Sequence, residues 1–125
     1  SRYVFHFHRP ETLKTRLEED KTRRARLQDL PELNTENLRA CQIDAIQGME
    51  HSRKQGKPRA LLQMATGSGK TYTAVTQVYR LAKFAKIKRA LFLVDRGNLA
   101  TNAKDDFDQF GIPHDGRNFS PHYNV

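Results

Sequence analysis

Apolar side chains recur at helical spacing in three stretches of the chain. The first stretch has them at positions 38, 41, 45, 46 and 49, and the second at positions 74, 75, 78, 81, 82 and 85. The third has them at positions 99, 103, 107 and 110, and it begins at Asn98, a residue type that favours an N-cap. Because each set lines one face of a helix, we expect three amphipathic helices in these stretches.

Two short, mostly apolar runs lie between these helices, at residues 59–64 and 90–94. Runs of this length are typical of buried strands, and the first is bounded by Pro58 and a glycine-rich turn. The alternating residues 3–8 indicate a further short strand. Strand, turn, helix, strand, helix is the βαβ pattern, so we expect an α/β fold in which helices flank a parallel sheet.

The N-terminal part of the chain has a different character. Charged residues dominate positions 11–28, where only Leu13, Leu17 and Leu27 form a thin apolar stripe, which predicts a solvated helix or linker. Pro31 and the polar residues 34–37 then interrupt any helix. We therefore divide the chain into a linker segment, 1–33, and a compact unit, 34–125. Two strands do not complete a doubly wound sheet, so we expect this unit to be the N-terminal part of a larger domain.

Composition excludes several classes of protein. No uninterrupted apolar run exceeds six of the 125 residues, whereas a membrane-spanning helix needs about 20, and the first residues contain no secretory signal. Cys41 is the single cysteine, which favours a reducing compartment, and we expect a cytoplasmic protein. The 22 Lys and Arg residues outnumber the 14 Asp and Glu residues, and the net charge of +8 favours polyanionic partners such as nucleic acid.

A glycine-rich turn, residues 65–71, joins the first predicted strand to its helix. Gly67 and Gly69 let the backbone curl so that N–H groups and the helix N-terminus face phosphate oxygens. Lys70 is expected to contact the β and γ phosphates, and the Thr71 hydroxyl to bind Mg²⁺, so these two residues take the catalytic roles. The predicted nucleotide contacts in this phosphate-binding loop are Thr66, Gly67, Ser68, Gly69, Lys70 and Thr71.

The loop departs from the general pattern at one position. Met64 stands six residues before the lysine, where most phosphate-binding loops have glycine. This departure disfavours kinases and small GTPases.

Residues 38–46, 59–71 and 91–99 together resemble the motifs of superfamily 2 helicases and translocases, and in particular of the restriction (R) subunit of type I restriction-modification enzymes. The resemblance implies that residues 1–33 follow a nuclease domain and that residues 34–125 begin the first of two RecA-like motor domains. It also implies an ATP-driven motor that translocates double-stranded DNA, a type I site-specific deoxyribonuclease that also hydrolyses ATP. The implied partners are the methylation (M) and specificity (S) subunits, with no membrane. We expect the chain alone to be inactive.

The resemblance also assigns residues to the nucleotide. Gln42 falls at the glutamine that hydrogen-bonds adenine in such motors, and a side-chain amide can donate to and accept from that base. Arg39 lies one helical turn earlier and is expected to assist the same site. The implied cofactors are therefore ATP and Mg²⁺.

Asp95 admits three interpretations. An apolar run that ends in Asp is typical of the Mg²⁺-binding Walker B strand, but motor families need Glu next and Arg96 follows here. The resemblance instead places Asp95 in a motif that grips the DNA backbone, with Arg96 and Asn98 near phosphate. The third interpretation is an exposed loop without a role.

Two other functions fit the sequence. One is a different superfamily 2 motor, such as a type III restriction enzyme or a repair helicase, with the same ATP chemistry. The other is a non-enzymatic basic module that binds nucleic acid through charge alone. The basic clusters within residues 53–59 and 83–89 fit either contacts to DNA phosphates or solvated faces.

Overall fold

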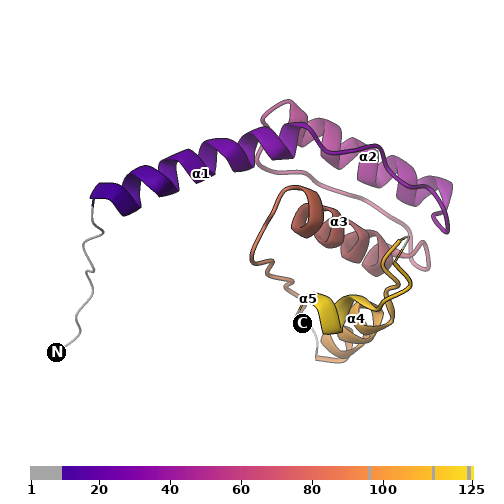
Figure 1. The fold of residues 1–125 in the computed structure, drawn as a ribbon. Coiled ribbons are helices and arrows are strands. Elements are labelled where there is room, and N and C mark those ends of the chain that lie inside the picture. The colour runs from indigo at the N-terminus through magenta and orange to yellow at the C-terminus, as the bar shows by residue number, and fades with distance from the viewer. Residues whose placement is uncertain (1–9, 96, 114, 124) are drawn as a thin grey trace.

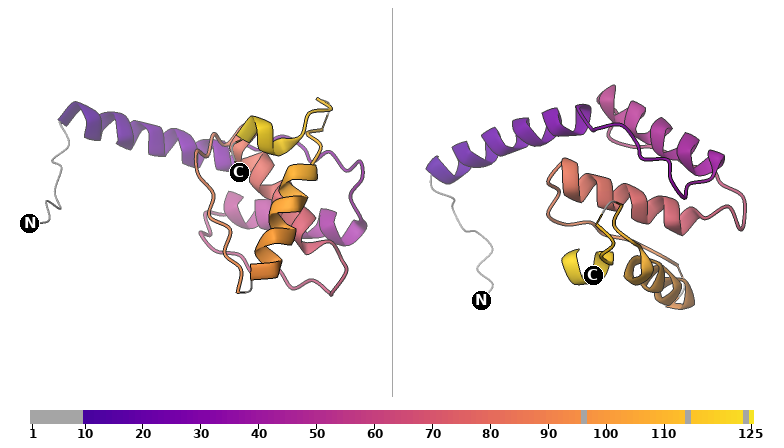
Figure 2. Two further views of the ribbon diagram at one scale, coloured as in Figure 1. Left: turned by 90° about the horizontal axis from the view of Figure 1, so that it is seen from below. Right: turned by 45° about the vertical axis from the view of Figure 1, so that its right-hand side comes forward.

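The computed structural model describes residues 10–95, 97–113, 115–123 and 125, and its regular elements are helices (Figure 1). These are α1 (Pro10–Gln28), α2 (Ala40–Lys54), α3 (Lys70–Phe84), α4 (Gly97–Gln109) and α5 (Phe119–Tyr123). Helix α3 lies in the middle, between α2 and α4, and α5 packs on α4. The N-terminal end of α1 extends away from the other helices in every view (Figure 2).

The predicted helices are confirmed. The three amphipathic stretches correspond to α2, α3 and α4, and the charged stretch 11–28 forms α1. Leu13 and Leu17 on α1 are 47 % and 65 % exposed, as a thin apolar stripe on a solvated helix predicts. Within the described residues, no helix is long and apolar enough to span a membrane.

The predicted parallel sheet is not observed in the described residues. Segments 59–64 and 90–94 form no β-strands. Among the described residues, β-pairing is limited to an isolated antiparallel bridge between Gly111 and Asn118. A strand needs a hydrogen-bonded neighbour, and these two segments do not pair with each other. Their leucines are consequently exposed, at 93 % for Leu61, 83 % for Leu91 and 81 % for Leu93. The predicted strand at residues 3–8 lies outside the described residues.

One apolar core joins α3 to the C-terminal part of the chain. Tyr79 on α3 contacts Phe110 with ring centroids 5.7 Å apart and Phe119 at 6.4 Å. Phe119 in turn stacks on Tyr123 at 4.6 Å. Each such pair contributes about 0.5–1.5 kcal/mol beyond its buried area. The buried members are Val75, Tyr79, Phe107, Phe110, Ile112 and Phe119.

The opposite face of α3 is held by buried polar contacts. Arg80 is only 4 % exposed, and its Nε and Nη2 donate to the two carboxylate oxygens of Glu50 on α2, at 2.6 and 3.0 Å. The same guanidinium donates to the backbone carbonyls of Pro31 and Glu32. One arginine therefore ties α3 both to α2 and to the segment that follows α1.

Gln77 extends this contact along α3. Its Nε2 donates to Glu50 Oε1 at 3.2 Å, and its Oε1 accepts a hydrogen bond from Arg53 on α2 at 2.5 Å. Burial lowers the pKa of Arg53, while the charge of Glu50 acts in the opposite direction. These groups form hydrogen bonds with one another, and the bonds hold α2 in a fixed position along α3, the helix that begins at the glycine-rich loop.

Candidate nucleotide-binding site

The backbone of the glycine-rich loop curls in the way that a phosphate-binding loop requires. Gly67 has φ of +76° and Gly69 has φ of +81°, both in the left-handed region, and Gly69 is the N-cap residue of α3. Side chains with a Cβ pay roughly 1–2 kcal/mol in this conformation. Inside the loop, the backbone N–H and the hydroxyl of Ser68 both donate to the Ala65 carbonyl, at 3.2 and 2.6 Å. The loop therefore leads directly into the positive end of the helix dipole.

Lys70 is the first residue of α3, and its ammonium lies back over the loop. Its Nζ donates to the carbonyls of Met64 at 3.4 Å and Ala65 at 3.2 Å. The side chain is exposed, so an anion in the loop can take these hydrogen bonds over. Thr71, the next helical residue, is half-buried at the same helix end.

The N-terminus of α2 docks against this loop through the two residues that the sequence analysis assigned to the nucleotide. Arg39 Nη1 donates to the Gly67 carbonyl at 3.0 Å. Gln42 is 4 % exposed, and its Nε2 donates to the Gly69 carbonyl at 3.2 Å. The structure therefore brings Arg39 and Gln42 together with the glycine-rich loop.

The amide of Gln42 is also engaged within α2. Its Oε1 accepts the backbone N–H of Arg39, the N-cap residue, at 2.8 Å, so the side chain caps the start of its own helix. The Gln42 amide therefore already uses one of its N–H donors and one lone pair of its oxygen. Because only 4 % of the residue is exposed, a hydrogen bond to adenine requires this side chain to be uncovered.

Two contacts of the loop were not predicted from the sequence. Thr73 donates through both its hydroxyl, at 2.9 Å, and its backbone N–H, at 3.0 Å, to the Gly69 carbonyl that Gln42 also contacts. Cys41 Sγ lies 4.0 Å from the Ser68 carbonyl. A threonine four residues after the helix N-cap often bonds back to that carbonyl, so Thr73 could have been anticipated from its position.

The residues expected at DNA lie elsewhere. Asn98 lies in the first turn of α4 and is exposed, and its Oδ1 accepts the N–H of Leu99 at 3.0 Å. The helix begins at Gly97, so Asn98 lies inside the first turn and the prediction of Asn98 as its N-cap is wrong. Asp95 is exposed as well, and Arg96 lies outside the described residues. Within the described part of the chain, no hydrogen bond joins Asn98 to the glycine-rich loop.

A loop with two glycines in the left-handed region, followed by lysine at the start of a helix, has the arrangement of a phosphate-binding loop. Residues 35–122, which contain it, match the protein family described as "Type III restriction enzyme, res subunit". The chain belongs to this family.

Curated relatives with similar sequences are endonuclease subunits of type I restriction enzymes. The chain is 38 % identical to the EcoKI endonuclease subunit of Escherichia coli K12 over 110 residues, which are 87 % of this chain and 9 % of that protein. It is 42 % identical to the EcoAI endonuclease subunit of Escherichia coli over 91 residues, 70 % of this chain and 11 % of that protein. The resemblance to type I restriction subunits is thus confirmed.

A third relative extends this similarity to another organism. The SsaAORF53P type I restriction endonuclease subunit of Staphylococcus saprophyticus is 30 % identical over 73 residues, 58 % of this chain and 8 % of that protein. The chain thus spans about a tenth of the length of the curated relatives it matches. No solved structure matches it.

Proposed function

We propose that this chain is the ATP-binding part of an endonuclease subunit of a type I restriction-modification system, an enzyme that translocates double-stranded DNA by hydrolysing ATP and cleaves it. The observation that carries the proposal is the loop around Lys70, with its ammonium over the loop carbonyls and α2 docked against it through Arg39 and Gln42. The type I relatives support the same assignment.

In this proposal the loop holds the triphosphate. Backbone N–H groups of residues 66, 67, 69 and 70 and the dipole of α3 face the phosphates, and Lys70 neutralises the charge that develops on the β and γ oxygens. When Mg²⁺ is bound with the nucleotide, it screens the same charge. Thr71 would offer one hydroxyl to that metal ion, and phosphate oxygens of the nucleotide would supply further ligands. This donor set fits Mg²⁺, which keeps several waters and needs few protein ligands.

Gln42 gives this site its base preference in the proposal. The side chain turns from Gly69 to adenine when the nucleotide binds, and Arg39 keeps the loop against α2 through the Gly67 carbonyl. Nucleotide binding would thereby change the contact between α2 and the loop, because one N–H of the Gln42 amide cannot donate to both Gly69 and adenine.

The wider architecture follows from the exposed leucines of segments 59–64 and 90–94. Leu91 and Leu93 stand two residues apart and are both more than four-fifths exposed, and Leu61 is exposed to a similar degree. Such apolar, strand-like segments are stable once other strands pair with them. We therefore propose that they belong to a RecA-like parallel sheet, in a protein divided near residue 33, with DNA near Arg96 and Asn98.

The partners and location of the proposed enzyme follow from the type I system. Double-stranded DNA is the polymer that it moves along, methylation and specificity subunits join it in one complex, and the cytoplasm is where it acts. A different superfamily 2 motor is the second candidate, either a repair helicase or a type III restriction enzyme, and the description of the matched family names the latter.

DNA-stimulated ATP hydrolysis by the protein in its full natural length tests the proposal. We expect Lys70→Ala to lower kcat by about 100-fold or more, the loss that follows removal of a group that stabilises transition-state charge. Lys104→Ala is the matched control, because Lys104 is an exposed lysine on α4, and it should leave the rate unchanged. A Lys70→Ala variant that hydrolyses ATP at the wild-type rate would refute the proposal.

A further inference from the structure

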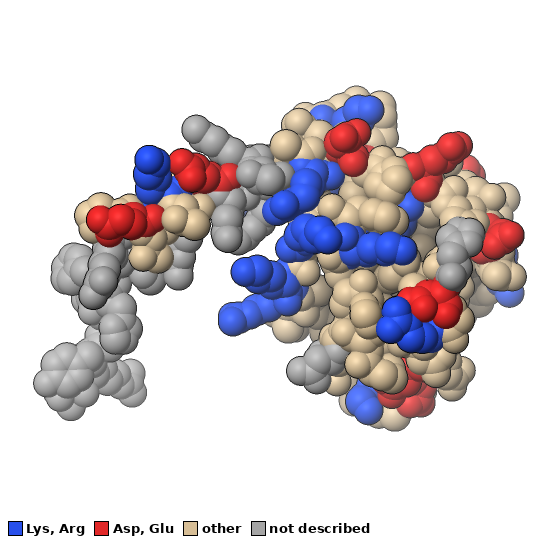
Figure 3. All heavy atoms as spheres, viewed as in Figure 1, with Lys and Arg blue, Asp and Glu red and all other residues tan. Residues whose placement is uncertain are grey.

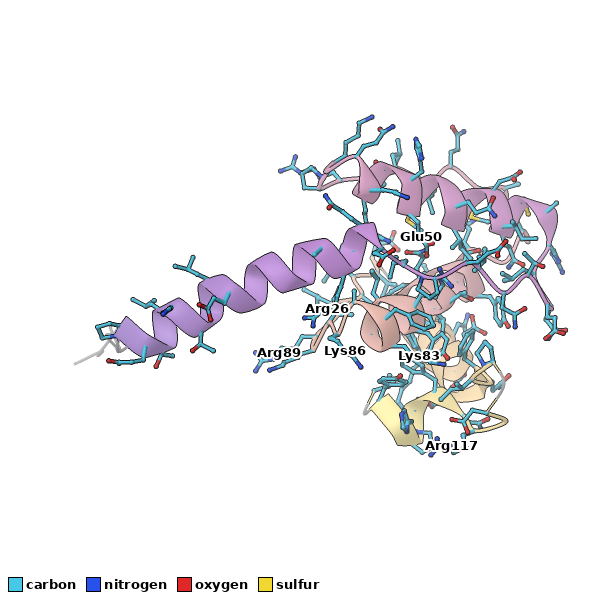
Figure 4. All side chains as sticks on the ribbon, turned by 45° about the horizontal axis from the view of Figure 1, so that its top comes forward. Arg26, Glu50, Lys83, Lys86, Arg89 and Arg117 are labelled. Carbon is cyan, nitrogen blue, oxygen red and sulfur yellow. The ribbon has the colours of Figure 1, made fainter. Side chains whose placement is uncertain are left out.

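Positive charge is concentrated at the end of α3 that is remote from the glycine-rich loop. We call the residues Arg26, Lys83, Lys86 and Arg89 the basic patch. Arg26 comes from the last turn of α1 and Lys83 from the last turn of α3, while Lys86 and Arg89 follow that helix. Figure 4 shows their side chains gathered in one region, and blue side chains cluster over the same helix ends in Figure 3.

Within the described part of the chain, no carboxylate forms an ion pair with these charges. Lys86 and Arg89 form no ion pair there, and the Nε of Arg26 is buried without a hydrogen-bond acceptor. Lys83 donates to the hydroxyl of Tyr79 at 2.8 Å, a neutral acceptor. Glu50, an acid on neighbouring α2, is already occupied by Arg80. Like charges gathered in this way repel one another until an anion neutralises them.

The helix dipoles account for only part of the patch. A cation in the last turn of a helix is favoured, which explains Arg26 and Lys83, but the effect ends with that turn. Lys86 and Arg89 lie beyond it, and both are exposed.

Lys86 also occupies a strained position. Its φ is +58°, and the N–H of the next residue, Ile87, returns to the Leu81 carbonyl at 3.2 Å, which closes a turn that normally has glycine. A lysine in this conformation costs roughly 1–2 kcal/mol. Strain of this kind is found where a side chain is needed for function.

We propose that the basic patch binds phosphate groups of the backbone of double-stranded DNA and forms a DNA contact separate from residues 95–98. Phosphodiester oxygens accept hydrogen bonds from guanidinium and ammonium groups, and Lys83, Lys86 and Arg89 are exposed. The choice of DNA over another polyanion rests on the proposed function. Helix α3 separates the patch from the nucleotide loop by about 22 Å, at 1.5 Å for each of its 15 residues.

The test is the salt dependence of DNA binding by the protein in its full natural length. The double variant Lys86→Gln/Arg89→Gln is compared with Lys57→Gln/Arg59→Gln, which removes the same two residue types from the exposed loop after α2. Each lost phosphate contact reduces the slope of log Kobs against log salt by about 0.9. We expect the patch variant to lower the slope by about 2 and weaken binding at least tenfold, with a smaller change in the control.

Two results would overturn the proposal. One is an equal loss in both double variants, which would mean that net charge alone attracts DNA. The other is unchanged DNA binding by the patch variant, including the case in which it instead loses association with another protein subunit.

ATP binding by the same patch variant separates this proposal from the proposed function. The patch variant should bind ATP normally, because the loop lies at the other end of α3. A patch variant with weakened DNA binding, in a protein whose Lys70→Ala variant hydrolyses ATP like wild type, would leave the DNA contact standing and refute the motor.

Discussion

Gly69 carries two constraints at a single position. Its φ of +81° disfavours any residue with a Cβ, and a Cβ built there would lie 2.4 Å from Nε2 of Gln42. The carbonyl of the same residue accepts hydrogen bonds from Gln42 and Thr73. The shape of the loop therefore depends on one glycine that α2 approaches closely.

Gly69→Ala should consequently damage nucleotide binding more than its small volume suggests. The added methyl group must displace the amide of Gln42 and also pays about 1–2 kcal/mol for its backbone conformation. We expect ATP affinity to fall at least tenfold in a titration with a fluorescent ATP analogue. The control is Gly48→Ala within α2, where nothing lies within 4 Å of an added Cβ, and which should stabilise the helix by about 1 kcal/mol. Equal affinities for both variants would contradict the close approach of α2.

Gln42 is the residue on which base selectivity depends in our account. Gln42→Ala removes the amide that would pair with adenine and leaves the triphosphate contacts of the loop in place. We expect the ratio of ATP to GTP affinity to fall by about fivefold to tenfold, the effect of one hydrogen bond worth about 1 kcal/mol. Competition of ATP and GTP for the labelled analogue measures this ratio. An unchanged ratio would show that Gln42 serves only the backbone N–H of Arg39 and the carbonyl of Gly69.

At the scale of elements, helices were predictable and strands were not, for a physical reason. The spacing of apolar residues within a helix is local, so α2, α3 and α4 could be located from the sequence. A strand exists only with a hydrogen-bonded neighbour, which a local apolar run such as 90–94 cannot specify. The glycine-rich loop was likewise contiguous and recognisable. The bonds of Arg80 to Glu50 and Pro31 join residues 30 and 49 positions apart, which no local pattern reports.

The contact between Glu50 and Arg80 should set how firmly α2 and the segment after α1 are held on α3. Glu50→Gln leaves the buried guanidinium without its counter-charge, at a cost of about 3–5 kcal/mol. We expect backbone amides of α2 to exchange hydrogen at least 100-fold faster, measured by mass spectrometry on the protein in its full natural length. Asp44→Asn, on an exposed position of the same helix, should leave exchange unchanged. Equal exchange in the two variants would contradict this account.

At the scale of the whole molecule, α3 connects the two proposed sites. Its N-terminus follows the glycine-rich loop, and its C-terminus lies at the basic patch, whose residues are labelled in Figure 4. One face packs on the aromatic core and the other on the buried polar contacts with α2. Nucleotide at one end and DNA at the other would thus act on a single rigid element, which is a physical route for coupling in an ATP-driven DNA motor.

The central claim is that the loop around Lys70 binds a nucleoside triphosphate. Equilibrium binding of a fluorescent ATP analogue with Mg²⁺, to wild type and to Lys70→Ala in the full natural length, tests it most directly. We expect wild type to bind and Lys70→Ala to bind at least tenfold more weakly, a difference of about 1.4 kcal/mol or more. Equal affinity of the two proteins, or no binding by wild type, would contradict the claim.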